Sequence, residues 1–221
     1  MAFESKIRPM TWENGKSKMI DQTVIPYEYK YVEITTGDDM FDAIRNMIVR
    51  GAPAIGIGGA RGIVLYAQEG ANKFSNVEEF KAWLLEKADY MATSRPTAVN
   101  LSWALKRMVT GLEAEAVATV LAGQKWLEKE AIKIHEEDVA ACKAMGEHGL
   151  SLLKPGMGIL THCNAGSLAT VKYGTALSPV YVAKEKGHNI KVFADETRPL
   201  LQGARLTAFE LCDAGVDTTV I

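Results

Sequence analysis

The stretch Gly158-Ile159-Leu160-Thr161-His162-Cys163-Asn164-Ala165-Gly166 decides the fold class of this 221-residue chain. Its apolar first half indicates a buried strand, and similar strand signals return at residues 190–194 and 217–221. Residues 167–186 and 201–214, which separate these strands, have helical patterns. A β-α-β-α-β succession calls for a parallel sheet with right-handed crossovers, so we expect an α/β fold in this part of the chain.

Upstream of this region the pattern is mostly helical. Short strands are expected at residues 18–22 and 29–34, and helices at 36–50, 54–69, 75–93, 98–109 and 113–152. The expected fold class is therefore α/β, with a mainly helical N-terminal domain (residues 1–150) and the first part of a Rossmann-like parallel-sheet domain (residues 151–221). Because the last strand falls at the end of the sequence, the sheet has an exposed edge, and we expect the sequence to be the N-terminal portion of a longer chain.

Composition and charge limit the kinds of ligand that the chain can bind. The chain has a mass of 24.1 kDa, 48% hydrophobic and 24% charged residues, and a net charge of −2. It has no overall basic field for nucleic acid or anionic lipid, so an anionic ligand has to be held by a few placed cations. The sequence shows no signal peptide and no apolar run of about 18 residues, which predicts a cytoplasmic protein without membrane contact.

Cysteine spacing gives no sign of a metal site. Cys142, Cys163 and Cys212 are far apart and have neither C-x-x-C spacing nor a paired histidine motif, so we expect no zinc site. The glycine run Gly56-Ile57-Gly58-Gly59-Ala60-Arg61-Gly62 has an arginine where the dinucleotide-binding fingerprint needs its third glycine. This run follows a helix and predicts close helix packing, which leaves a nicotinamide-dependent enzyme as a remote alternative.

Cys163 is the strongest candidate for chemistry. It ends the first strand of the β-α-β unit, and ligands of such sheets sit beyond the carboxyl ends of the strands. A helix beginning just after it is expected to lower the pKa of the thiol, which can then be a nucleophile, a general acid or a polar contact. His162 should point to the opposite side and is interpreted as a structural histidine. Asp195 and Glu196 end the second strand, and at most one of them is expected to face a ligand, the other pairing with Arg198 or capping a helix.

Two arginines lie just before expected helices. Arg50-Gly51-Ala52 precedes the helix at 54–69, and Arg95 stands in the loop before Pro96. Helix N-termini attract anions and arginine binds phosphate through two parallel hydrogen bonds, so a phosphate or carboxylate ligand stands as one interpretation, with ordinary loops that carry solvated arginines as the equal alternative. Gln202 could bond a sugar hydroxyl or a phosphate, with a surface helix position as the alternative. His135, His148 and His188 lie in polar contexts and are interpreted as surface residues.

Four motifs in order resemble the methylthioribose-1-phosphate isomerase family over essentially the whole chain. They are Arg50-Gly51-Ala52-Pro53-Ala54-Ile55-Gly56, Ser94-Arg95-Pro96-Thr97-Ala98-Val99-Asn100, Thr161-His162-Cys163-Asn164-Ala165-Gly166 and Ala194-Asp195-Glu196-Thr197-Arg198-Pro199. This family shares its fold with the regulatory subunits of translation initiation factor 2B.

The resemblance implies a homodimeric aldose–ketose isomerase of methionine salvage that needs no metal or organic cofactor and acts on 5-methylthioribose 1-phosphate. It implies that Cys163 is catalytic and that Arg50, Gly51, Ala52, Arg95 and Gln202 bind the substrate. The family's catalytic aspartate would follow the strand that ends at Ile221, and its later Asn-Lys contact lies further on, so neither is in this sequence.

Two other functions remain open. A sibling isomerase for 5-deoxyribose 1-phosphate or ribose 1,5-bisphosphate would keep the phosphate-binding residues and Cys163 and differ around C5 of the sugar. A regulatory subunit like those of initiation factor 2B would use the fold as a binding scaffold. The intact stretch His162-Cys163-Asn164-Ala165-Gly166 disfavours the scaffold, since a scaffold has no need for a thiol at a ligand crevice.

Overall fold

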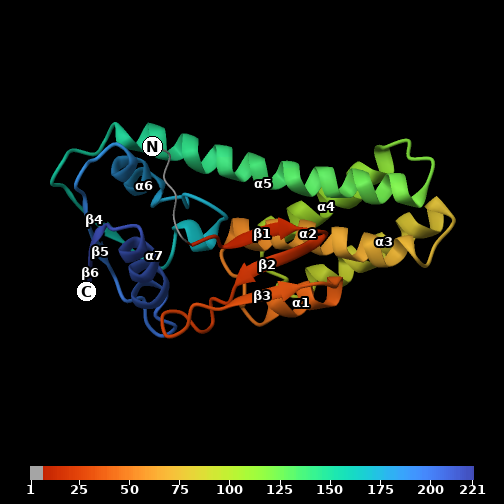
Figure 1. Ribbon diagram of the computed structural model, residues 1–221, viewed down its shortest axis with the longest axis horizontal. Helices are drawn as coiled ribbons and strands as arrows, with labels where there is room; N and C mark the ends of the chain where they lie inside the picture. Colours follow the sequence, from red (N-terminus) through yellow and green to blue (C-terminus); the bar gives the residue numbers. More distant parts are fainter. Residues whose placement is uncertain (1–6) are drawn as a thin grey trace. The chain divides into compact units, whose positions relative to one another are not determined.

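The computed structural model describes residues 7–221 (Figure 1). Contacts within the chain divide it into two compact units. Of the described residues, the sheet unit comprises 7–10, Ile20–Tyr31 and Asp138–Ile221, and the helical unit comprises Thr11–Met19 and Val32–Glu137. Each unit is described by itself. The expected domains 1–150 and 151–221 stay a prediction, and the units differ from them because α5 (Val120–Leu150) contributes to both.

The helical unit is built around α2 (Ala52–Ala71), most of whose residues are buried. α1 (Gly37–Arg45), α3 (Val77–Ala92) and α4 (Val99–Ala114) surround it, together with the first part of α5. Gly56 explains the close approach of α2 and α4, because a Cβ there would lie 2.9 Å from the carbonyl oxygen of Asn100. The glycine run is thus a packing surface, as the sequence predicts.

A small sheet accompanies these helices, with strand order β1-β2-β3. β1 (Met10–Glu13) and β2 (Lys16–Ile20) are joined by the turn Asn14-Gly15, in which both residues have positive φ, 52° and 74°. Such turns match the twist of a two-stranded hairpin. β2 and β3 (Tyr31–Ile34) lie near the two expected strands, whereas β1 was not predicted from the sequence.

The sheet unit contains the three parallel strands that the sequence predicts. β4 (Gly158–Thr161), β5 (Lys191–Ala194) and β6 (Asp217–Val220) run in the order β4-β5-β6, with Thr161, Ala194 and Val220 in register. The mixed α/β fold class is therefore confirmed.

One face of this sheet packs against helices. α6 (Ser178–Glu185), α7 (Ala208–Asp213) and the last part of α5 contribute to a core that includes Tyr181, Val192 and Leu211. On the other face Leu160 and Phe193, which are in register, are 69% and 37% exposed.

The expected helix over residues 167–186 is wrong in its first half. The structure has a single 3₁₀ turn, η1 (Ser167–Ala169), then an irregular segment, and only then α6. Tyr173 and Gly174 have φ of 59° and 76°, and Gly174 lies against the backbone of Ala165 and Gly166, where a side chain would overlap. Backbone with positive φ cannot continue a right-handed helix, so the chain turns back on itself here.

Two further helix predictions need correction. α1 ends at Arg45, five residues before Arg50, because Met47 takes a left-handed conformation with φ of 61°. The helix expected at 201–214 begins as a π-helix, η2 (Gly203–Thr207), before continuing as α7. Among residues 7–221, every helix is too short or too polar to cross a membrane.

Candidate functional site

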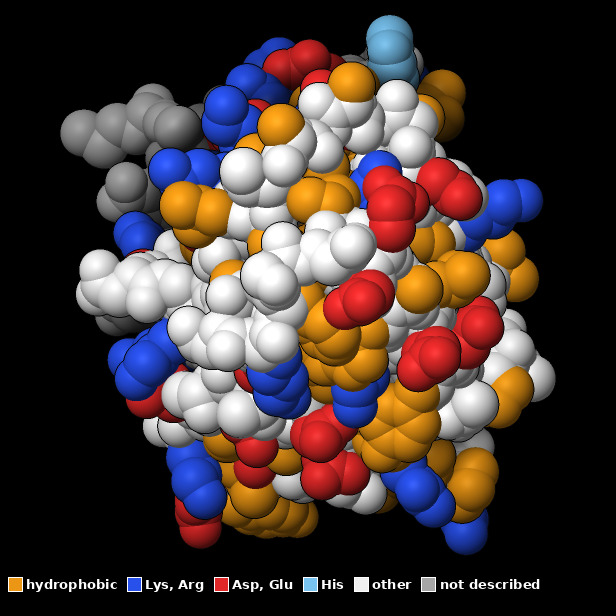
Figure 2. All heavy atoms as spheres, turned by 90° about the vertical axis from the view of Figure 1, so that its right-hand side faces the viewer, with side chains coloured by type: hydrophobic (Ala, Val, Ile, Leu, Met, Phe, Trp, Pro, Cys, Tyr) orange, Lys and Arg blue, Asp and Glu red, His pale blue; other side chains and the backbone are white. Residues whose placement is uncertain are grey.

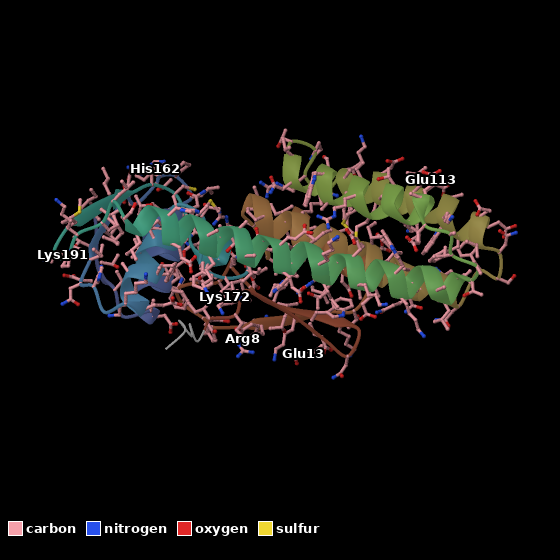
Figure 3. All side chains as sticks on the ribbon, turned by 90° about the horizontal axis from the view of Figure 1, so that it is seen from above. Arg8, Glu13, Glu113, His162, Lys172 and Lys191 are labelled. Atoms are coloured by element: carbon pink, nitrogen blue, oxygen red, sulfur yellow. The ribbon has the colours of Figure 1, made fainter. Side chains whose placement is uncertain are left out.

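The carboxyl edge of the parallel sheet gathers the polar residues that follow β4 and β5. Because Thr161 and Ala194 are in register, His162 and Cys163 follow β4 at the same edge at which Asp195 follows β5. Figure 3 labels His162, which follows β4 at this edge, and Lys191, which begins β5 at the opposite, amino edge.

The backbone of Cys163 is held in a strained conformation by bonds on both sides. Its φ is 59°, in the left-handed region. Its N–H donates to Oγ1 of Thr197 at 2.8 Å, and its carbonyl oxygen accepts a bond from Oγ1 of Thr207 at 2.7 Å. Thr197 is itself left-handed, with φ of 61°, which is rare for a β-branched residue. Conformations of this kind persist only where surrounding structure enforces them, and they cluster at functional sites.

The expected source of thiol activation is not observed. The sequence predicts a long helix starting after Gly166, whose N-terminus would stabilise a thiolate. The structure places there only the three residues of η1, which is too short to carry the dipole of a regular helix. The Cys163 side chain is half-buried.

His162 pairs with Asp195 rather than with Cys163. Its Nδ1 lies 2.7 Å from Oδ2 of Asp195, and the two side chains are 69% and 43% exposed. The N–H of Thr197 bonds to Oδ1 of Asp195, and this bond together with His162 lowers the pKa of the carboxyl. Asp195 is thus the member of the acidic pair with a local partner. Within residues 7–221 the structure shows no ion pair between Glu196 and Arg198, which the sequence offered as one possibility.

Gln202 lies beside the end of β5. It directly precedes η2, is half-buried, and leads into Gly203, whose missing side chain lets the backbone rest against the carbonyl oxygen of Asp195. Thr197, the partner of Cys163, also lies near Gly203, so Gln202 and Cys163 belong to the same carboxyl edge of the sheet.

Glu210 is a central residue of this edge that sequence reasoning missed. It is 1% exposed and its carboxylate accepts bonds from Nδ2 of Asn164 at 2.6 Å, Oγ of Ser167 at 2.6 Å and the N–H of Leu168 at 3.0 Å. Burial raises its pKa, and these hydrogen bonds oppose that rise. A signal was present in the sequence, since Glu210 stands one turn after Leu206 and next to Leu211, on the buried side of the helix.

In the helical unit, the residues before α2 form a bare helix start. Gly51 is the N-cap with φ of 94°, a conformation that favours glycine. No side chain caps this end, no acidic residue stands in its first turn, and the half-buried Arg50 directly precedes it. The first N–H groups of a helix lack partners within the helix, so this end suits an anion.

Arg95 stands close to a second helix start of the same kind. α4 begins at Val99 after Ala98, which provides no capping side chain, and Arg95 is half-buried three residues before that cap. The close contact between Gly56, in the second turn of α2, and Asn100, in the first turn of α4, brings the beginnings of the two helices together. The structure therefore brings both helix starts, with their arginines, to one end of the α2–α4 pair.

A buried cation and histidine lie elsewhere in the helical unit. Arg61 is 5% exposed, and its guanidinium donates to the carbonyl oxygen of Thr11 at 2.9 Å and reaches Nδ1 of His135 at 3.1 Å. Burial lowers the pKa of His135 to about 4, and the nearby Arg61 contributes. Arg61 can donate only to a neutral ring nitrogen. The interpretation of His135 as a surface residue is wrong, because its burial and this bond make it part of the packing.

The predicted site residues thus form two groups. Arg50, Gly51, Ala52 and Arg95 belong to the helical unit, and Cys163 and Gln202 to the sheet unit. Among residues 7–221, no three His, Cys, Asp or Glu side chains are arranged to hold a metal ion. The predicted absence of metal and cofactor stays a prediction.

A cavity of about 290 Å³ lies at the opposite, amino edge of the sheet. Its lining includes Lys184, His188, Lys191 and Asp217. The cations there already have partners, since Lys184 donates to the carbonyl of Gly215 and Lys191 pairs with Asp217. Its position also disagrees with the rule that parallel sheets bind ligands at their carboxyl edge. We therefore place the candidate site at the Cys163 edge.

Comparison with known proteins identifies the family of the chain. Residues 48–221 match the model of the Initiation factor 2 subunit family. The chain is 56% identical over 207 residues to 5-deoxyribose 1-phosphate isomerase of Petrotoga mobilis, which covers 94% of this chain and 59% of the relative. It is 50% identical over 219 residues to the protein of that name from Clostridium botulinum, and the match covers 98% of this chain and 62% of that relative.

Solved structures give a similar picture. The crystal structure of 5-methylthioribose 1-phosphate isomerase from Pyrococcus horikoshii OT3 matches with a TM-score of 0.92 and 40% identity, over 99% of this chain and 61% of that one. Subunit delta of translation initiation factor eIF-2B from A. fulgidus matches with a TM-score of 0.88 and 44% identity, over 98% and 62%. The chain spans about three fifths of the length of the relatives it matches.

Proposed function

The chain belongs to the initiation factor 2 subunit family, and on that premise we propose that its protein is a sugar-phosphate isomerase that converts a ribose 1-phosphate modified at C5 into the matching ribulose 1-phosphate. The observation that carries the proposal is the strained backbone of Cys163 at the carboxyl edge of the sheet, where hydrogen bonds hold both its N–H group and its carbonyl oxygen. A thiol held in this way has a use in catalysis, whereas a binding scaffold would not need it.

The first substrate to test is 5-deoxyribose 1-phosphate. The relatives at 50% to 56% identity carry the name of an isomerase of this sugar, which supports it over the methylthio sugar that the motifs suggested. 5-Methylthioribose 1-phosphate is the second candidate, supported by the structural match to an isomerase of that name. Both sugars have the same phosphate at C1 and differ only in the substituent at C5.

The phosphate is assigned to the helical unit. Arg50 and Arg95 would bind its oxygens, and the free N–H groups at the start of α2, at Gly51 and Ala52, would add uncharged donors. The phosphate keeps its bond to C1 throughout, so it serves to anchor the sugar and fix the reacting carbons.

The chemistry is assigned to the sheet unit. The phosphate on the anomeric oxygen prevents the sugar from opening as a free aldehyde, so the ring oxygen must take a proton as its bond to C1 breaks. The hydrogen on C2 then moves to C1, either as a proton through an enediol-like species or directly as a hydride, while the C2 hydroxyl loses its proton to become the ketone. Cys163 would exchange the proton in the first scheme, and Gln202 would orient a sugar hydroxyl.

Replacement of the thiol tests this assignment. In the full-length protein, Cys163→Ser should reduce kcat by at least about 1000-fold, because a serine hydroxyl is a far weaker acid than a thiol and forms almost no anion to accept a proton at neutral pH. The substrate Kd, measured by calorimetry, should change less than about threefold. Cys212→Ser is the matched control, since Cys212 is exposed on α7 and lies outside the site. Near-normal turnover by the Cys163 variant contradicts the assigned role.

A parallel assay tests the substrate. The full-length protein is given 5-deoxyribose 1-phosphate, 5-methylthioribose 1-phosphate and ribose 1,5-bisphosphate, and ketose formation is followed by NMR. We expect the highest kcat/KM with the first. Higher kcat/KM with the methylthio sugar would move the protein to the second candidate. Absence of turnover with all three, together with stable binding of a protein partner, would assign the chain to the regulatory branch of the family.

The remaining proposals concern assembly and cofactors. We propose a homodimer that works without metal or organic cofactor, as the resemblance implies. Sedimentation of the full-length protein and an assay in the presence of EDTA would test these two points. A monomeric active species, or activity lost with EDTA and restored by a metal, would overturn the respective proposal.

A further inference from the structure

We propose that Glu210 is a positioning residue for Cys163: its buried carboxylate holds the segment 164–168 in the one conformation that keeps the backbone of Cys163 left-handed. The structural part of this proposal stands on the described contacts. Its catalytic meaning rests on the proposed isomerase function.

The first step is that Glu210 fixes the segment after β4 at three points. One carboxylate oxygen accepts the amide N–H of the Asn164 side chain at 2.6 Å. The other accepts the hydroxyl of Ser167 at 2.6 Å and the backbone N–H of Leu168 at 3.0 Å. Three donors that belong to one five-residue segment therefore converge on one side chain from α7.

The second step leads from this segment to Cys163. Nδ2 of Asn164 also donates to Oγ1 of Thr207 at 3.1 Å, and the Thr207 hydroxyl donates to the carbonyl oxygen of Cys163 at 2.7 Å. Asn164, the neighbour of Cys163, is thus clamped between Glu210 and the threonine that holds the Cys163 carbonyl. On the other side, Thr197 accepts the N–H of Cys163.

The absence of a side chain at Gly166 leaves space for this carboxylate. Gly166 has no side chain, and a Cβ there would overlap Oε1 of Glu210. The structure provides no cation to Glu210 within residues 7–221, so hydrogen bonds alone compensate its burial. A buried acidic group is costly in such surroundings, and an apolar side chain would serve packing better. The pKa of Glu210 is raised accordingly.

The π-helical start of the supporting helix fits the same role. η2 contains Thr207 and runs directly into α7, which contains Glu210. π-Helical turns are rare and often occur at functional sites, where they redirect side chains. Here the π-turn and the next turn aim Thr207 and Glu210 at the same segment.

Glu210→Gln is the sharpest test, because it keeps the size of the side chain. An amide has one acceptor oxygen and an NH₂ group that only donates. In the variant, the NH₂ group would therefore point either at the donor of Asn164 or at the donors of Ser167 and Leu168, and the hydrogen bonds on that side would be lost. In the full-length protein we expect backbone amides of residues 163–168 to exchange with deuterium at least about tenfold faster, while β5 and β6 keep their protection.

The kinetic expectation is a split between kcat and KM. Displacement of a reacting group by about 1 Å costs on the order of 100-fold in rate, so Glu210→Gln should lower kcat by about 100-fold. KM should change less than about threefold, because the phosphate is assigned to residues of the helical unit. A merely structural role would lower protection throughout the sheet unit instead.

Two companion variants keep the test decisive. Ser167→Ala removes one of the three donors and should give the same local pattern at smaller size, which carries the test if Glu210→Gln fails to fold. Ser178→Ala is the matched control, since Ser178 is fully buried in the same unit but bonds only to the carbonyl of Thr175. It should leave exchange at 163–168 unchanged.

The outcomes separate the two proposals. Unchanged protection at 163–168 in Glu210→Gln, or faster exchange spread evenly over the sheet unit, overturns the positioning role. If the wild-type protein turns over no sugar phosphate, the proposed function fails, and local loss of protection in the variants still supports the positioning of Cys163 by Glu210.

Discussion

The helix starts of α2 and α4 and the segment after β4 both belong to the proposed site, but their backbones are stabilised in opposite ways. At the helix starts the polar groups are backbone N–H donors that any regular helix leaves free, and Gly51, with φ of 94°, has the unusual backbone conformation there. After β4 the backbone is left-handed at Cys163 and is held by side chains from Thr197 and Thr207. One region uses regular structure, and the other depends on a network that opposes local preference.

The two kinds of support predict different effects of substitutions on ligand binding, stability and catalysis. A helix start keeps its N–H donors when a neighbouring side chain is truncated, so changes there should affect binding more than stability. The Cys163 segment is maintained by several mutually dependent bonds, so one bad contact should affect folding and catalysis together.

The largest expected effect follows from filling the space beside Glu210. Gly166→Ala places a methyl group on Oε1 of a carboxylate that three donors hold in place. We expect a loss of about 3 kcal/mol or more in the free energy of unfolding, measured by urea denaturation. Gly123→Ala is the control. Gly123 lies inside α5, where alanine favours the helix, and the new Cβ would lie 3.3 Å from the ring of Phe80. Equal stability of the two variants would show that the segment is not rigid.

Removal of a cation that we propose to bind the phosphate should come next. Arg95→Ala is expected to lower kcat/KM by about 30-fold, mostly through KM, since a charge-assisted hydrogen bond contributes about 2 kcal/mol. The Tm should change little. Lys106→Ala removes an exposed cation from the same helix, α4, and controls for the change in net charge. Loss of kcat at constant KM would contradict a binding role for Arg95.

A smaller effect is expected where the two helix starts touch. In Gly56→Ala the new Cβ would lie 2.9 Å from a backbone oxygen of Asn100, which cannot rotate away. The strain, reduced by the better helix propensity of alanine, should cost about 1 kcal/mol. KM should rise by about threefold as α2 and α4 shift. Gly59→Ala, whose Cβ would meet a rotatable Leu101 side chain, should raise KM less. The reverse ranking would show that backbone contact is not what positions the helix starts.

The smallest effect concerns pH and the helical unit. His135 has a pKa of about 4 in the folded protein, below its ordinary value of about 6.5. Between these values the unfolded chain binds a proton that the folded protein does not, so stability falls as pH drops from 7 toward 4. After allowance for the partial exposure of the ring, the lowered pKa of His135 should reduce the free energy of unfolding by about 1 kcal/mol between pH 7 and pH 4. Urea denaturation should show a shallower pH dependence for His135→Gln, and parallel curves would contradict the shift.

The sequence predicted the parts of this molecule that depend on local pattern. The strand periodicity at residues 158–163, 190–194 and 217–221 gave the parallel sheet, and the glycine run gave the packing of α2. The irregular segment after Ala169 could not be predicted in this way, because Tyr173 and Gly174 leave the helical region to fit against Ala165 and Gly166.

The same distinction holds for the candidate site. Residue type and position after a strand indicated Cys163, and positions just before expected helices indicated Arg50 and Arg95. Thr197, Thr207 and Glu210 were not found, because their roles depend on partners 34 to 46 residues away in the sequence. A lone acidic residue on the apolar side of a helix is a signal that sequence reasoning can use, since burial of a carboxylate needs dedicated partners.

The open face of the parallel sheet affects how the chain behaves in solution. Sheets of this kind usually have helices on both faces, but Leu160 and Phe193 lie side by side in register and exposed. Water wets such a patch poorly, and sulfate salts strengthen contacts between apolar surfaces. The 221-residue chain should therefore bind a phenyl chromatography resin at moderate ammonium sulfate concentrations, and Leu160→Lys with Phe193→Lys should elute earlier.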